Sequence, residues 1–271
     1  MKSMRIIAIT LACVLLSTGL SAQQAVVTDT VFNQVDNNNL KQGYWKKYYK
    51  NGKVAYKGYF KDDKPRGVFL RYHEGGTLRA RMVYSQCGDS AQTILYYPNG
   101  KEIARGVFYM NRKDGEWQYF TQTGKVALVE NYKHGIKDGE VKTYYPTGEV
   151  YECVHWKNDQ KDGLTAQYYL NGMYKTTLMY KGGLENGPAI TYFPDGSSRM
   201  EGAYLQGLKH GEWKIFDRQG KLLSVINYTY GIADNQDELI DQETKTLDIM
   251  IKNVGRIQEP SIEEFIRGQG Y

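Results

Sequence analysis

The residue types that most often carry catalysis or bind metal ions are scattered in this sequence. His73, His134, His155 and His210 each occupy a different position of a 24-residue repeat, so stacking the repeats does not align them into a ligand set. The sequence has no G-x-S-x-G nucleophile elbow, phosphate-cradling loop or dinucleotide fingerprint. These absences predict a protein that is not an enzyme and binds no metal or cofactor.

Acidic residues recur at the turns between repeats, at Asp114, Asp138 and Asp162. A row of calcium sites is one interpretation. However, carboxylates about 10 Å apart, as expected for stacked hairpins, cannot share one ion. Turn formation is the other interpretation, and the one that the spacing favours.

Aromatic side chains are the remaining candidates for binding, because rings stack on sugars and pack against proteins. One repeat position is tryptophan or phenylalanine in four units, and these four residues form the candidate partner-binding surface. Alternatively, the rings fill the sheet surface and cover one another. An exposed row of tryptophans would favour a glycan- or lipid-binding module. The four residues are Trp45, Phe69, Trp117 and Trp213.

These rings are positioned by a repeat that recurs eight times without insertion or deletion. One column is glycine in every unit, and a second is glycine in all units except at Ala91. Such periodicity predicts a stack of like supersecondary units. The structural repeat residues are a glycine column (Gly52, Gly76, Gly100, Gly124, Gly148, Gly172, Gly196 and Gly220) and an aromatic column (Tyr48, Tyr72, Tyr96, Phe120, Tyr144, Tyr168, Tyr192 and Phe216).

Turn chemistry predicts that each unit is one β-hairpin. Asn-Gly and Asp-Gly pairs such as Asn51-Gly52 favour two-residue hairpin turns, and a looser loop of about five residues is expected between units. The predicted fold is all-β, an elongated single-layer antiparallel β-meander of eight hairpins and sixteen strands. With this register, one face of the fourth unit holds Trp117, Thr121, Val126 and Tyr132, and the other holds Phe120 and Ala127.

The N-terminus has the pattern of a secretory signal peptide over residues 1–22. Lys2 and Arg5 precede an apolar stretch, and a small-residue segment ends at Ala22. A lipoprotein with Cys13 as the modified residue is the less favoured alternative, since apolar residues continue past it. We therefore expect export to the periplasm or outside the cell, and no transmembrane span in the mature chain.

Shorter segments flank the repeats. Residues 23–42 are expected to form an N-terminal cap strand or linker, residues 43–234 the eight repeats, and residues 235–271 a helical cap or tail. Asn235 to Lys252 fits an amphipathic helix with an apolar side that includes Leu239, Ile240 and Leu247.

The charge argues against nucleic-acid binding, and the cysteine spacing argues against a disulfide. The net charge of +5 is mild and its cations are spread over the turns, which does not indicate nucleic-acid binding. Cys87 and Cys153 lie almost three repeats apart. A stack of hairpins separates them by roughly 25 Å, beyond the reach of a disulfide.

The pattern G-x-W-x-x-Y-Y-x-x-G resembles the bacterial MORN-repeat variant, also seen in YwqK-type antitoxin proteins. Its best matches begin at Gly43, Gly115 and Gly211, while Thr93 and Thr165 replace the tryptophan in weaker units. The resemblance implies an interaction module. We expect an exported, non-catalytic scaffold that binds an unknown protein. The alternatives are a toxin-neutralising protein and an envelope glycan- or lipid-binding module.

Overall fold

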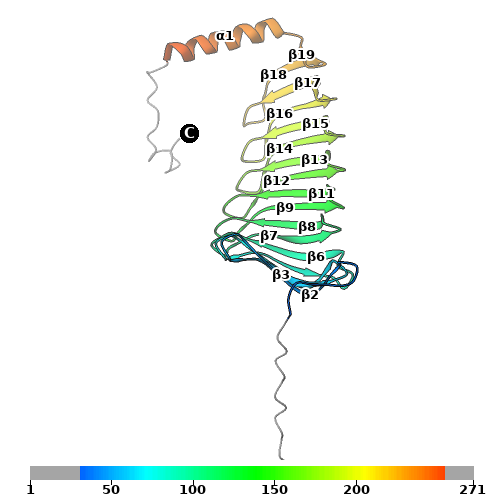
Figure 1. Ribbon diagram of the computed structural model, residues 1–271. Coiled ribbons are helices and arrows are strands. Elements are labelled where there is room, and N and C mark those ends of the chain that lie inside the picture. The colour runs from blue at the N-terminus through cyan, green and yellow to red at the C-terminus, as the bar shows by residue number, and fades with distance from the viewer. Residues whose placement is uncertain (1–30, 254–271) are drawn as a thin grey trace, which may run out of the picture. The chain divides into compact units, whose positions relative to one another are not determined.

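The computed structural model describes residues 31–253, which form one open antiparallel sheet of 19 strands followed by a helix (Figure 1). The predicted signal peptide lies outside the described residues. The elements are β1 (Gln34–Val35), β2 (Lys41–Tyr48), β3 (Val54–Lys61), β4 (Lys64–Tyr72), β5 (Leu78–Tyr84), β6 (Ser90–Tyr96), β7 (Glu102–Tyr109), β8 (Arg112–Phe120), β9 (Val126–Lys133), β10 (Ile136–Lys137), β11 (Gly139–Tyr144), β12 (Val150–Lys157), β13 (Gln160–Tyr168), β14 (Tyr174–Lys181), β15 (Leu184–Tyr192), β16 (Ser198–Leu205), β17 (Leu208–Phe216), β18 (Leu222–Thr229), β19 (Ile232–Ala233) and α1 (Gln236–Asn253).

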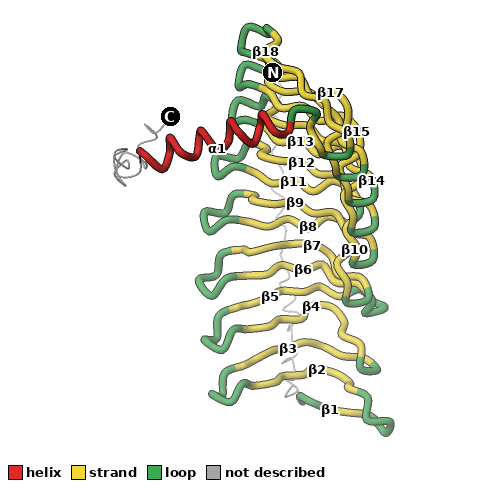
Figure 2. The backbone as a smooth tube through the Cα atoms, turned by 90° about the horizontal axis from the view of Figure 1, so that it is seen from above, coloured by secondary structure: helices red, strands yellow, loops and turns green. Residues whose placement is uncertain are grey.

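Each strand pairs with its neighbour in sequence, so the sheet is a meander. β10 and β11 both pair with β9 and are two parts of one rung, interrupted at Asp138. That interruption and the short strands β1 and β19 account for the difference between sixteen expected strands and the 19 observed. Figure 2 shows turns along both sides of the ladder of strands. The predicted all-β meander is confirmed.

The tight turns lie between units, not within them, and the prediction for the turn types was wrong. Asp62 and Asp63 link β3 to β4 with φ of 53° and 60°, the two positive values of a type I′ hairpin turn. At the glycine column the loop has three residues: Tyr49 N donates to Lys53 O at 2.8 Å, and Gly52 N donates to Tyr49 O at 3.0 Å. The eight glycines of this column have φ between 77° and 117°, as such a loop requires.

The three-residue loop changes the register next to it. Phe120 pairs with Val126, so these two residues share a face instead of lying on opposite faces as predicted. A bulge between Tyr119 and Phe120 accompanies the loop. Beyond the bulge, Trp117 pairs with Glu130 and Gly115 with Tyr132, and Trp117 and Tyr132 share a face as expected.

Ala91 marks the one unit boundary with a different geometry. Glycines of the second column, such as Gly67 with φ of 57°, adopt a left-handed backbone that alanine resists. The bulge seen between β3 and β4 is absent between β5 and β6, where Met82, Val83 and Tyr84 pair in unbroken register. The surplus chain forms the longer loop over residues 85–89.

The ends of the array also differ from the repeats. β1 pairs with β2 where the cap strand was expected, and α1 confirms the predicted helix. Ile240, Leu247 and Met250 on that helix are exposed, so its capping role stays a prediction. Between residues 31 and 253, no helix is long and apolar enough to cross a membrane.

Candidate interaction surface

Three of the four candidate partner-binding rings are buried. Trp117, Trp213 and Phe69 are 0%, 3% and 4% exposed, and Trp45 is half-buried. We call the side of the sheet that carries these rings the ring face and the opposite side the stripe face. Within the described part of the chain there is no exposed tryptophan row. The burial of Trp117, Trp213 and Phe69 agrees with the alternative in which the rings fill the sheet surface and cover one another.

Three of the rings are buried because each lies on a glycine of the preceding strand. A Cβ placed on Gly106 would lie 2.4 Å from a carbon of the Trp117 indole. The equivalent distance is 2.1 Å from Gly58 to Phe69 and 2.3 Å from Gly202 to Trp213. Any side chain at these glycines would displace the ring.

In units without a ring at this position, the larger residue lies on the preceding strand and the smaller residue takes the position of the ring. Met82 pairs with Thr93, Val154 with Thr165, and Leu178 with Ala189. Each pair occupies the same two repeat positions as Gly106 and Trp117. Thr93 and Thr165, which look like weak matches in the sequence, therefore complete the packing as smaller partners of larger residues. Comparing the two columns side by side would have revealed this.

The polar atoms of the indoles are also used internally. Trp117 Nε1 donates to Val107 O at 3.0 Å, and Trp213 Nε1 donates to Ala203 O at 3.2 Å. Buried indole N–H groups need such partners. Neither tryptophan has a free donor with which to bind a ligand.

Lysines cover the outer side of the ring face. Lys113 Nζ lies 5.2 Å from the centre of the Trp117 ring and 4.8 Å from that of Tyr132. Lys209 sits in the same way over Trp213 and Tyr228, at 4.7 and 4.9 Å. These are cation–π distances. Lysine at this repeat position is a signal that the sequence analysis missed. The lysine side chains further reduce the access of a partner to the rings.

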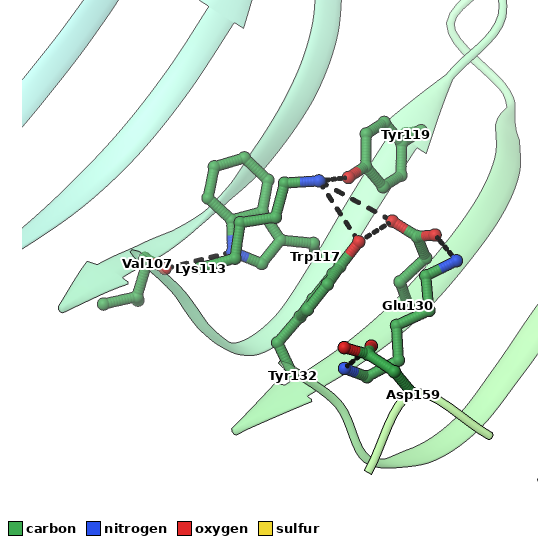
Figure 3. A network of polar contacts seen from close by, with 8 residues as sticks. Val107, Lys113, Trp117, Tyr119, Glu130, Tyr132 and Asp159 are labelled. Atoms are coloured by element: carbon green, nitrogen blue, oxygen red, sulfur yellow. Dashed lines mark hydrogen bonds and ion pairs between the residues drawn. The ribbon is translucent and has the colours of Figure 1, made fainter. Parts of the chain in front are cut away.

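The fourth unit carries a buried carboxylate in this layer, Glu130 (Figure 3). Glu130 Oε2 accepts from Tyr132 Oη at 2.6 Å, and Oε1 pairs with Lys137 Nζ at 2.7 Å. Lys113 Nζ lies 3.7 Å from Oε2 and contacts the Tyr119 hydroxyl. Sequence reasoning did not single out this cluster, although Glu130 stands where other units have an apolar residue or glycine.

Burial and mutual hydrogen bonds set the protonation states of Glu130, Tyr119 and Tyr132. Burial acts to raise the pKa of Glu130, but hydrogen bonds from Lys137 and Tyr132 outweigh it and hold the pKa below the ordinary 4.5. Burial and the Glu130 carboxylate raise the pKa of both Tyr119 and Tyr132. The carboxylate is therefore charged and the phenols are neutral, and both carboxylate oxygens have partners.

The other residues considered for chemistry have local structural roles. Asp114 Oδ1 accepts from His134 N at 2.8 Å, and Asp162 Oδ2 from Gly182 N at 3.2 Å, so each strand aspartate binds the backbone of the turn in the following unit. No group of three or more metal-binding side chains occurs in residues 31–253. Cys87 is exposed, Cys153 is buried, and both thiols are free.

Tyrosines at the turns join successive units, which sequence reasoning also missed. Tyr49 Oη donates to Tyr72 O at 2.7 Å, and Tyr169 Oη donates to Tyr192 O at 2.8 Å. The partner lies 23 residues further along, in the next unit. The recurrence of these tyrosines after the first aromatic column was the available signal.

The stripe face presents a line of cations, interspersed with apolar residues, across the first strands. Along successive strands, Lys46 pairs with Lys57, Lys57 with Leu70, Leu70 with Arg81, Arg81 with Ile94, and Ile94 with Arg105. Directly paired residues share a face. Lys57, Arg81 and Arg105 are exposed, and Lys46 is half-buried. We call Lys46, Lys57, Arg81 and Arg105 the basic stripe.

An exposed apolar row runs beside the basic stripe. Tyr44 and Tyr59 contact each other edge to face, with ring centres 5.3 Å apart. Both are exposed, as are Val68 and Val107 further along. Between strands β5 and β8, a depression of about 420 Å³ is lined in part by Arg81, Ile94, Arg105 and Val107. This combination of cations and apolar groups is suited to binding a macromolecule.

Four segments of the chain match the MORN repeat variant family: residues 41–62, 113–134, 137–158 and 209–230. Three of them contain the tryptophans at 45, 117 and 213, and all four begin at a lysine that covers a tryptophan ring. No curated protein matches the sequence.

Among solved structures, the crystal structure of TarM matches with 19% identity and a TM-score of 0.22 over 44% of this chain and 20% of that chain. An S. aureus TarM mutant in complex with fondaparinux, alpha-GlcNAc-glycerol and UDP matches with 16% identity and a TM-score of 0.22, over 44% and 19%. The chain thus aligns with about a fifth of each structure, and these similarities carry no structural or functional argument.

Proposed function

We propose that this chain, four segments of which match the MORN repeat variant, is a non-catalytic scaffold that binds a protein on its stripe face. The observation that carries the proposal is the difference between the two faces. The rings of the ring face pack on the sheet and are covered by lysines, whereas Lys57, Arg81, Tyr59 and Val68 on the stripe face are exposed.

The two faces also differ in what they can offer a partner. A tryptophan row would bind sugars or lipid by stacking, but burial of Trp117 and Trp213 removes the basis of that alternative. A toxin-neutralising role is a special case of protein binding in which the partner is a toxin. Its support is the resemblance to YwqK-type proteins, and it does not require a different binding surface.

Export is part of the proposal, supported by the pattern of Lys2, Arg5 and the apolar residues that follow. N-terminal sequencing of the protein recovered from cells expressing the full chain tests it. Cleavage after Ala22 gives a chain that begins at Gln23. A lipid-modified chain that begins at Cys13 would indicate the lipoprotein alternative, and an intact Met1 would contradict export.

Affinity capture from envelope extract tests the binding face. The bait is the full chain, compared with Lys57→Glu/Arg81→Glu on the stripe face and Lys47→Glu/Arg71→Glu on the ring face. All four residues are exposed and lie on β2 to β5, so the two variants change the charge equally in the same part of the sheet. A partner held by the wild type and the ring-face variant but lost by the stripe-face variant supports the proposal. Equal loss from both variants contradicts it.

A further inference from the structure

We propose that the basic stripe of one copy binds helix α1 of a second copy of this chain. This inference rests on the proposed function, because it assigns an occupant to the same face. The charge, the length and the apolar side chains of α1 each match the stripe.

The charges are complementary. The segment Gln236–Asn253 contains five carboxylates and two lysines, which gives it a net charge of −3. The stripe contributes four cations, of which Arg105 has a carboxylate partner, Glu102 Oε1, at 2.9 Å. Lys46, Lys57 and Arg81 have no carboxylate partner among residues 31–253. Opposite charge steers two such surfaces together and fixes their alignment.

The lengths agree. Lys46 and Arg105 are five strand spacings apart across the sheet, which is about 24 Å. An α-helix of 18 residues is about 27 Å long. A helix that lies across the strands therefore covers the whole stripe, because the helix and the stripe have similar lengths.

The apolar groups also correspond. Ile240, Leu247 and Ile251 are exposed, and their spacing of seven and four residues places them along one side of α1. Asp241 and Asp248 follow Ile240 and Leu247 directly, so they form an adjacent acidic line. The sheet has the same arrangement, with Tyr59, Val68 and Val107 in a row beside the cations.

The helix of the same chain cannot reach this site. Two residues separate β19 from α1, while Arg105, the nearest stripe cation, is on β7. Ten strand spacings separate β7 from β18, roughly 48 Å, which exceeds the length of the helix. The occupant is therefore the helix of another copy, and two antiparallel copies can exchange helices in a closed pair.

Sedimentation equilibrium of protein purified from cells expressing the full chain tests the inference. We expect a dimer whose dissociation constant rises about tenfold or more in Lys57→Glu/Arg81→Glu and in Asp241→Lys/Asp248→Lys, since each variant reverses two pairing charges. The matched ring-face variant Lys47→Glu/Arg71→Glu should dimerise like the wild type. Combining both reversals in one chain should restore the dimer.

Neutral variants distinguish a loss of charge pairing from a loss of folding. Lys57→Gln/Arg81→Gln should weaken the dimer less than the reversal does, with an unchanged circular dichroism spectrum. A wild-type chain that stays monomeric, a dimer insensitive to both reversals, or a combined variant that fails to recover would overturn the inference. So would a monomer whose stripe cations bind vesicles of anionic phospholipid.

The two proposals can fail separately. If the chain is monomeric but Lys57→Glu/Arg81→Glu still loses a captured protein, the helix-docking inference falls and the proposed function stands. If neither variant alters any association, both fall.

Discussion

The indole of Trp117 lies directly on the backbone of Gly106, so that a Cβ on the glycine would lie 2.4 Å from the ring. The same contact joins Phe69 to Gly58 and Trp213 to Gly202. It explains why the most conspicuous rings of the sequence are unavailable to a partner. Large and small side chains alternate between two columns, and this exchange fills the ring face along the ladder.

Gly106→Ala should destabilise the sheet, because its methyl group overlaps the Trp117 ring. We expect a loss of about 1–3 kcal/mol in the free energy of unfolding, measured by urea denaturation. Gly75→Ala is the control, since Gly75 has open space around it and no positive φ. Equal stability of the two variants would show that the ring moves away without cost.

Copying a natural pair should rescue that site. Trp117→Thr alone leaves a cavity and should cost about 3–5 kcal/mol. Combined with Gly106→Val it recreates the Val154–Thr165 pair, and the double variant should be more stable than the sum of the single changes predicts. Simple additivity in the unfolding free energies would argue against size exchange between the columns.

Glu130→Gln should lower stability at neutral pH by about 1–3 kcal/mol, because Lys137 and Tyr132 lose a charged partner. The folded-state pKa of Glu130 is depressed, so its stabilisation is complete above the ordinary carboxyl pKa of 4.5 and is lost as the pH falls through the folded value. Thermal melts of both proteins from neutral to acidic pH should therefore converge below that range. Glu212→Gln, at an exposed ion pair with Lys214, should change little at any pH. A constant gap between wild type and Glu130→Gln would contradict this assignment.

Met110→Asn should stabilise the protein by about 0.5–1 kcal/mol. Met110 has a φ of 46° in the two-residue turn between β7 and β8, where asparagine is favoured and methionine is strained. Leu170→Asn also removes an exposed apolar side chain, but Leu170 is absent from the positive-φ residues. A similar rise in melting temperature for both variants would point to a solubility effect instead of turn strain.

The 24-residue period was enough to predict the all-β meander, because one hairpin cannot bury its rings and must stack on the next. The turn types could not be predicted in the same way. Asn51-Gly52 fits a two-residue turn and equally the left-handed residue that ends a three-residue loop. Met110 and Tyr230, both with positive φ, give no turn signal at all.

The candidate site was predicted less well for a related reason. The position of Trp117 in the repeat shows that it recurs with Trp45 and Trp213, but its burial depends on Gly106 in the preceding strand. The basic stripe is defined by the cross-strand register, and the incorrectly predicted turn types gave the wrong register. Lys57 and Arg81 fall on one line only once Leu70 is seen to pair with both.

The most direct test of the central claim is amine footprinting by mass spectrometry of dilute and concentrated protein. Lys57 lies on the stripe face and Lys47 on the ring face of neighbouring strands, and both are exposed. We expect Lys57 to lose reactivity on association while Lys47 keeps it. Protection of Lys47 with an unchanged Lys57 would contradict it, because the partner would then occupy the ring face.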